Sequence, residues 1–304
     1  MKISRKTLSL PAREGARVIA SKLLRDADAA ARRLSRRSTP KSLHDFRVAL
    51  RRLRSWLKSF RPELGPALRR KEEDRLRAIA RATSLGRDAD VQLAWARETA
   101  RRWKGKRRRA AARFARHLTA EKREADAGGD AEIPGWFREV SAELHDRLDV
   151  PRPSRAATAS GKRTLAQAMA REVGTHLKDV TDALDEVRSV DDDKQAHRAR
   201  IDAKHLRYLM EPAAPFVKRG GGVLRKIKTL QNDLGVLHDA HLISHAAERA
   251  TSDDKLGRDV PRRAQTEMDA AFQRVKRRWL KRRPLGLDRD VKAFAKRLSA
   301  ATGG

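Results

Sequence analysis

The stretch SLHDFRVALRRLRSWLKSF (residues 42–60) decides the fold of this chain, because its residues repeat with the period of an α-helix. It holds six Arg, Lys or His side chains, nine apolar or aromatic ones and a single acid. On a helix that turns about 100° per residue, five of the cations fall within an arc of about 80°. These are His44, Arg47, Arg51, Arg54 and Lys58. The apolar side chains gather on the opposite side and predict a buried face.

The composition of the whole chain also favours helices. Of its 304 residues only 17 are Gly and 11 are Pro, aromatic residues make up 4%, and Ala, Arg, Leu, Lys and Glu dominate. The length is sufficient for a hydrophobic core in one large domain or two modest ones. We therefore expect an all-α protein.

The net charge is strongly positive, with 72 Lys and Arg against 40 Asp and Glu, or +32 at pH 7. Such an excess destabilises a compact state through self-repulsion, so it suggests a polyanionic partner: nucleic acid, an acidic membrane surface or a polymer of phosphate. General solubility is the alternative. No apolar run is long enough to span a bilayer, and charges interrupt any hydrophobic region of a secretory signal. The absence of cysteine excludes disulfides, and we expect a cytoplasmic protein.

Turn signals divide the chain into segments of helical length, and the Pro- and Ser-rich stretch DVPRPSRAATASG (149–161) is expected to connect two halves, 1–150 and 151–304. The halves resemble each other. HDFRVALRRLR begins at position 44 and HRARIDAKHLR at position 197. SLGRDADV (84–91) and DLGVLHDAHL (233–242) form a second pair. The sequence thus predicts an internal duplication that gives two similar helical bundles.

The second copy keeps the cationic row, since His197, Arg200, Lys204 and Arg207 share one stripe. In the helix that follows each row, further cations line up: Arg225 and Lys228 in the second half, and Arg70, Arg77 and Arg81 in the first, where Glu73 and Asp74 sit among them. Like charges at i,i+4 are destabilising by roughly 0.2–0.5 kcal/mol per pair, so a repeated single-sign face suggests an external anion. An ordinary solvated face is the alternative.

Arginine suits phosphate because its planar fork donates paired hydrogen bonds, whereas lysine acts as a point charge. The histidine at the head of each row, His44 or His197, could donate to a phosphate oxygen, and a nearby anion would favour its protonated form. Each could instead cap or bridge its own helix end.

The chain resembles the CHAD family, named for a conserved-histidine α-helical domain. The resemblance rests on SLHDFRVALRRLR (42–54), LGRDADV (85–91), AHRARIDAKHLRYLME (196–211) and KIKTLQNDLGVLHDAHL (226–242), and covers roughly residues 11–298. It implies two four-helix bundles related by a pseudo-twofold axis, a basic groove or pore at their junction, and binding of inorganic polyphosphate. It also implies that the two rows from His44 to Arg54 and from His197 to Arg207 contact phosphate. The repeat is imperfect. In the second half, Glu211 stands at the position of Lys58 and His205 at that of Arg52. The segment from Leu85-Gly86 to Asp88 is also two residues shorter than the matching segment from Leu234-Gly235 to Asp239. The site is therefore expected to be lopsided.

Nucleic acid binding is the alternative function. The runs RRWKGKRRRAAARF (101–114) and FQRVKRRWLKRR (272–283) interleave aromatic residues with cations, as a base-stacking platform would. The aromatic residues recur at helical intervals, however, which favours inward packing. No helix-turn-helix, RNP or zinc-finger signature is present.

An enzyme is not expected. The chain has no P-loop, G-x-S-x-G or H-E-x-x-H motif, nor the alternating ExExK glutamates of the triphosphate-hydrolysing CYTH domain to which family members are often fused. His238, His241 and His245 share one helix face, but no acidic ligands accompany them as in di-iron bundles, so no metal site is predicted. Asp88 and Asp239 each lie shortly after a glycine where a helix could begin, so N-capping is expected rather than catalysis.

We therefore expect a non-enzymatic, all-helical protein without a cofactor that binds inorganic polyphosphate through His44, Arg47, Arg51, Arg54, Lys58, Arg77, Arg81, His197, Arg200, Lys204, Arg207, Arg225 and Lys228. In a cell that stores the polymer, such a protein could coat or enter polyphosphate granules. Non-specific binding of RNA or DNA to the same basic surface is the competing hypothesis.

Overall fold

The structure, a computed structural model, describes residues 3–83, 85–126, 132–148, 163–252, 258–280 and 286–301. The expected connection at 149–161 lies outside the described residues. Within the described ranges there are helices and no strand, and one antiparallel bridge joins Pro11 to Thr164. The all-α expectation is confirmed. No helix in these ranges is both long and apolar enough to cross a membrane.

The α-helices are α1 (Arg5–Ser9), α2 (Ala12–Arg36), α3 (Pro40–Ser59), α4 (Arg61–Leu64), α5 (Arg70–Ala82), α6 (Leu85–Arg102), α7 (Gly105–Asp126), α8 (Ile133–Leu148), α9 (Leu165–Asp185), α10 (Asp193–Met210), α11 (Gly220–Ser252), α12 (Asp259–Val275) and α13 (Leu287–Ala300). Short 3₁₀ turns η1 (Gly65–Ala67) and η4 (Ala214–Phe216) and the π-helical turn η5 (Lys276–Leu280) complete the order.

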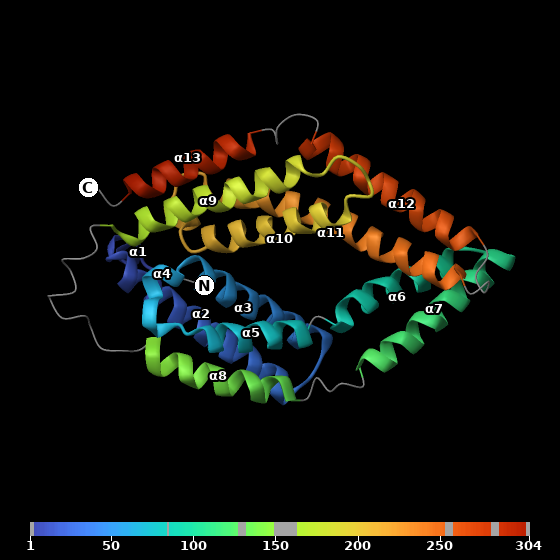
Figure 1. The fold of residues 1–304 in the computed structure, drawn as a ribbon, viewed down its shortest axis with the longest axis horizontal. Helices are drawn as coiled ribbons and strands as arrows, with labels where there is room; N and C mark the ends of the chain where they lie inside the picture. Colours follow the sequence, from blue (N-terminus) through green and yellow to red (C-terminus); the bar gives the residue numbers. More distant parts are fainter. Residues whose placement is uncertain are drawn as a thin grey trace.

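The helices pack in three groups (Figure 1). In the first, α2 packs on α3 and α8, and α5 packs on both α3 and α8. In the second, α9 packs on α10 and α13, and α11 packs on both of these. In the third, at the right of Figure 1, α6 and α7 pack on each other and on α11 and α12. The third group therefore combines helices from both halves of the chain.

Two hydrophobic cores hold these groups. The larger core runs without interruption from α1 and α2 to α13 and so joins the first two groups. A smaller, separate core fills the third group, where Phe114 of α7, Leu93 of α6 and Val260 of α12 are buried. The cationic helices α3 and α10 both belong to the larger core and contact each other directly.

Helix α3 forms where the sequence predicts it. Thr39 is the N-cap and Pro40 stands in the first turn; the Thr39 hydroxyl accepts a bond from the Ser42 amide at 3.1 Å, and the Ser42 hydroxyl accepts one from the Thr39 amide. The predicted buried face is in the core: Phe46, Leu50, Leu53, Trp56, Leu57 and Phe60 are each at most 2% exposed. The opposite, cationic face is consequently directed away from the core.

Trp56 is the main anchor of α3. Its indole Nε1 donates to the carbonyl of Ala16 at 2.9 Å, and its ring stacks on Phe60 at 4.1 Å between centroids. We expect Trp56→Ala to lower the free energy of unfolding by about 3–5 kcal/mol, the range for truncating a buried aromatic residue. Urea titration followed by circular dichroism measures this. The control Trp136→Ala removes a ring that is 42% exposed and should change stability far less; equal losses in both variants would contradict the anchor role.

Helix α5 is held beside α3 by ion pairs to α8. The fully buried Glu72 accepts from the Arg147 guanidinium at 2.5 Å and from the backbone amide of Arg69 at 2.9 Å. Arg75 bonds to Glu139 and Glu143 at 2.8 and 2.6 Å. Removing Arg147 would leave the buried Glu72 carboxylate without its charged partner, so this pair is the contact that ties α5 most strongly to α8.

The two aspartates expected to be N-caps occupy other positions. Asp239 lies well inside α11, which runs from Gly220 to Ser252 without a break, so that expectation is wrong. Asp88 lies in the first turn of α6 after its first residue, Leu85, rather than at the cap. The glycine before Asp239 does not end α11: a side chain at Gly235 would meet only Arg200 at 3.8 Å, an ordinary contact, and glycine inside a helix costs only about 1 kcal/mol.

Candidate polyanion-binding cavity

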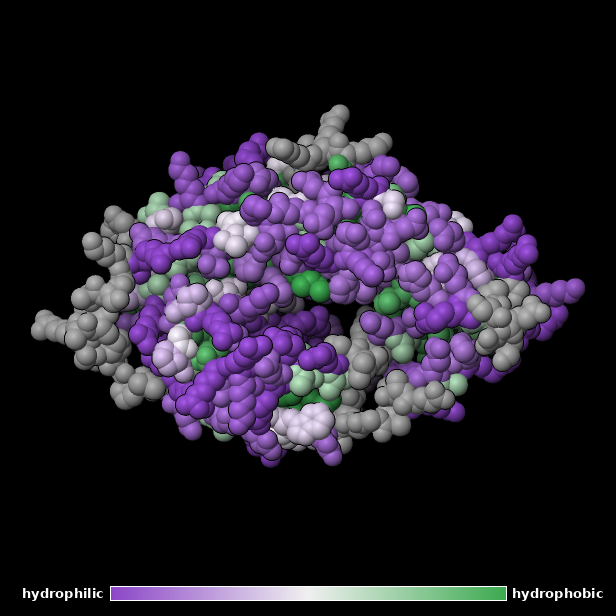
Figure 2. Space-filling view, viewed as in Figure 1, coloured by the Kyte–Doolittle hydropathy of each residue, from purple (hydrophilic) through white to green (hydrophobic). Residues whose placement is uncertain are grey.

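A cavity of about 1170 Å³ lies between α3 and α5 on one side and α10 and α11 on the other. Ten Arg and Lys side chains line it, against three carboxylates, Glu73, Asp74 and Asp88. The cations are Arg47, Arg51, Arg54, Lys58, Arg61, Arg70, Arg77, Arg81, Arg200 and Lys204. The cavity therefore collects positive charge, beyond the generally hydrophilic surface that Figure 2 shows.

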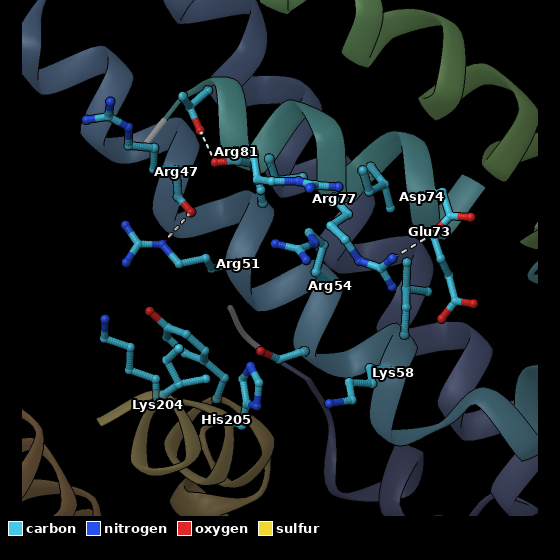
Figure 3. A pocket seen from close by; sticks show the side chains of 18 of the residues that line it. Arg47, Arg51, Arg54, Lys58, Glu73, Asp74, Arg77, Arg81, Lys204 and His205 are labelled. Carbon is cyan, nitrogen blue, oxygen red and sulfur yellow. Dashed lines mark hydrogen bonds and ion pairs between the residues drawn. The ribbon is translucent and has the colours of Figure 1, made fainter. Parts of the chain in front are cut away.

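The α3 wall carries the first predicted row. Arg47, Arg51, Arg54 and Lys58 extend from α3 into the cavity (Figure 3). The Arg51 Nε donates to the backbone carbonyl of Arg47 at 3.1 Å, which sets the direction of its guanidinium. Burial, together with nearby arginines of α5, lowers the pKa of Arg54 from its ordinary value. Three of the four cations of this wall are arginines, a side chain that proteins do not deprotonate.

The α5 wall is partly neutralised within itself, as its sequence indicates. Arg77 donates to Asp74 at 2.9 Å, and Glu73 pairs with Arg61 of α4 at 2.5 Å. Arg81 is exposed and lines the same cavity, above Arg54 in Figure 3.

The α10 wall faces α3 across the cavity and carries His197, Arg200 and Lys204 of the second predicted row. Burial, followed by the charges of Arg200 and Arg51, lowers the pKa of Lys204 to about 7. Asp239 of α11 opposes this shift but does not cancel it. Members of both predicted rows thus line one cavity, and the charge of Lys204 is conditional on its surroundings.

Histidines complete the α10–α11 side. The Nδ1 atoms of His197 and His238 are 3.2 Å apart, so one ring donates to the other. Burial, then Arg200, lowers the pKa of both rings, that of His238 to about 3. Burial and the nearby Lys58 lower the pKa of His205 to about 4. These rings are therefore neutral near pH 7.

Four of the predicted site residues lie outside the cavity. His44 is exposed in the first turns of α3, behind the N-cap Thr39, so it neither lines the cavity nor caps the helix. Arg207 is held by Glu211 at 2.6 Å and by Gln231 at 2.8 Å. Arg225 and Lys228 are exposed on α11 and do not line the cavity either.

Several lining residues were not among the predicted contacts. Arg61 continues the α3 row one step further and could have been found by extending the period of that row past the turn. His238 could not be placed from sequence, because it meets His197 only where α11 crosses α10. His205 and Tyr208 follow the same pattern: their positions in the cavity depend on how α10 packs.

The features that suggested other functions have structural explanations. Phe114, Phe272 and Trp279 of the basic runs are buried, and the Trp279 Nε1 donates to Asp233 at 2.8 Å, as inward packing predicts. Of the three histidines on α11, His241 is buried and donates from Nε2 to the carbonyl of Val190. Among the described residues no group of three or more His, Cys, Asp or Glu is placed to hold a metal ion.

Comparison with known proteins agrees with this architecture. The family model described as CHAD domain matches residues 18–248. The crystal structure of the CHAD domain from the plant Ricinus communis matches with 19% sequence identity and a TM-score of 0.60, over 97% of this chain and 94% of that chain. A search of curated proteins found no match. Since the family model covers well over half of its length, the chain belongs to the CHAD domain family.

Proposed function

We propose that this protein binds inorganic polyphosphate in the cavity between α3 and α10 and does not act as an enzyme. The observation that carries the proposal is the convergence of the two rows: Arg47, Arg51 and Arg54 face Arg200 and Lys204 across one cavity. Cations on opposite walls repel one another, and a chain of phosphates between them would neutralise both. The known association of the family with polyphosphate supports the same ligand.

The mechanism is electrostatic. Phosphate oxygens would accept paired hydrogen bonds from the guanidinium groups of α3, and the bound counterions of the polymer would be released. No contact in this scheme reads a base or a sugar. We further propose that the two halves of the chain, 1–150 and 151–304, descend from a duplicated unit, and that the protein acts in the cytoplasm at polyphosphate granules.

A second candidate, non-specific binding of nucleic acid, has one observation in its favour. Helix α7 carries an exposed row of cations outside the cavity: Lys106, Arg109, Arg113 and Arg116. Such a row suits the backbone of a single strand. Phe114 of α7 is buried beneath this row, and Trp103 at the start of the run is partly buried against the smaller core, which favours polyphosphate in the cavity.

A competition experiment separates the two functions. Labelled long-chain polyphosphate is bound to the protein at near-physiological salt and displaced by unlabelled polyphosphate, single-stranded RNA or duplex DNA of equal phosphate content. We expect unlabelled polyphosphate to displace the label at a concentration at least tenfold below that of either nucleic acid. Displacement by RNA at an equal or lower concentration would support nucleic acid binding instead.

A further inference from the structure

The two long walls of the cavity differ in chemistry. The α3 wall presents three arginines, whose charge is permanent, and Lys58, while the α10–α11 wall presents one arginine, Arg200, beside Lys204, His197, His205 and His238, whose charge depends on a proton. Both walls enclose the same space, and Lys204 and His205 lie opposite the α3 row (Figure 3). The empty cavity is therefore asymmetric in charge although both sides carry basic residues.

We propose, on the basis of the proposed function, that the α10–α11 wall selects polyphosphate over nucleic acid because it gains charge beyond that of Arg200 only when a dense anion enters, Lys204 and the His197–His238 pair taking up protons as phosphates bind. These residues thus determine specificity as well as affinity.

The hydrogen bond between His197 and His238 supports this inference independently of any titration. At 3.2 Å between Nδ1 atoms, one ring must donate and the other must accept, so both rings cannot be protonated while the bond is kept. The donor ring can gain a proton at its other nitrogen without losing the bond. The pair is therefore built to hold one additional positive charge.

In the empty protein, the groups around Lys204 and the cavity histidines disfavour the protonated forms of these side chains. The groups that face them are Arg51, Arg54 and Lys58 from α3, Asp88 from α6, His176 from α9, Asp193, Arg200 and Arg207 from α10, and Asp239 and His241 from α11. Burial, followed by the charges of the cations in this set, which outnumber the carboxylates, lowers the pKa of Lys204 to about 7. A bound anion reverses the balance, so the protonated forms become favoured.

Charge density then decides between ligands. Polyphosphate carries a charge on every phosphorus with only a bridging oxygen between neighbours. RNA separates its phosphates by a ribose and carries a base on each. Protonation of several half-buried Lys and His side chains requires several anionic oxygens within a short distance. Polyphosphate meets this requirement better than a single strand of RNA, which is expected to satisfy mainly the permanent cations of α3.

These proton uptakes determine how the affinity for polyphosphate changes with pH. Lys204 is largely neutral in the empty protein above pH 7 and charged in the complex, so it takes up a proton between about pH 7 and its ordinary pKa of about 10.4. The histidines act in a lower window, between the depressed pKa values of the empty state and about 6.5 or above in the complex. Polyphosphate binding should tighten as the pH falls through each window, by up to about tenfold per pH unit for each proton taken up.

Titration calorimetry in two buffers of different ionisation enthalpy, Tris and HEPES, tests the inference with size-fractionated polyphosphate and with poly(U) RNA. At pH 8 we expect uptake of about one proton per bound polyphosphate segment and clearly less with RNA. Lys204→Arg makes the charge permanent, so it should abolish most of this uptake and reduce the preference for polyphosphate over RNA by about tenfold. At pH 6, with Bis-Tris and MES as the two buffers, His238→Asn should reduce the remaining uptake.

The control is His245→Asn, an exposed histidine on the same helix that lies near Asp193 and Glu248 and does not line the cavity. It should leave both proton uptake and selectivity unchanged. If polyphosphate binds tightly without proton uptake at pH 8 and pH 6, the proposed function stands and this inference is overturned. If polyphosphate does not bind at all, the proposed function itself fails, and the inference with it.

Discussion

Replacing Arg51 and Arg54 together by glutamine is expected to weaken polyphosphate binding by about 10²–10⁴-fold and, at the same time, to raise the melting temperature of the empty protein. The binding loss follows from removing two charge-assisted contacts worth about 1.5–3 kcal/mol each, with about 1.4 kcal/mol per factor of ten. Fluorescence anisotropy with labelled polyphosphate measures it.

The gain in stability has a separate cause. Arg54 is partly buried and faces Arg77 and Arg81, whose charges oppose its own. Glutamine keeps most of the side-chain volume and removes this repulsion. A site that gives up stability for binding should behave in this way, whereas a structural role for Arg54 predicts a lower melting temperature.

The matched control is Arg108→Gln with Arg109→Gln. Both arginines are exposed on α7, and neither lines the cavity. The control changes the net charge by the same amount, so it separates a specific site from the general attraction of a cationic protein. If the control weakened binding as much as the cavity variant, the ligand would have to be placed on α7 and the proposed site rejected.

Salt is expected to have an effect of similar size. Raising the monovalent salt concentration from 50 to 200 mM should weaken polyphosphate binding by about 10³-fold if about seven cations contact phosphate, using the slope of about −0.7 per contact known for single strands. The ten cations that line the cavity are sufficient for this number. Anisotropy titrations at five or six salt concentrations give the slope directly.

The same titrations on the Arg51→Gln/Arg54→Gln variant provide an internal check. Two contacts are removed, so the slope should become less steep by about 1.4. The α7 control should keep the slope of the wild type. A wild-type slope near zero would show that ion release does not drive binding, and would contradict the electrostatic mechanism.

Much of the fold could be predicted because its signals are local. The period of the apolar residues predicts α3, and the matching cationic stripe from His197 to Arg207 predicts α10. Each pattern is a property of a single helix. The convergence of the α3 and α10 rows was also expected, but only through the internal repeat and the resemblance to the CHAD family.

The parts that could not be predicted depend on contacts between helices. Glu211 differs from its counterpart Lys58 in the first copy, and the sequence indicates only a lopsided site. In the structure Glu211 bonds to both Arg207 and Arg52, at 2.6 and 2.9 Å, and so removes Arg207 from the cavity. The His197–His238 pair likewise exists only because α11 crosses α10 at that level.

The continuity of α11 has a consequence for how the cavity could adjust to its contents. This helix of 33 residues, about 50 Å long, contributes to both hydrophobic cores and acts as a rigid spine for the half of the molecule that carries the histidines. On the opposite side of the cavity two helices take the place of one long helix, since α5 ends at Ala82 and α6 begins at Leu85. A change in the width of the cavity is therefore easiest on the α5–α6 side, which would move the arginines of α5 and leave the α10–α11 wall in place.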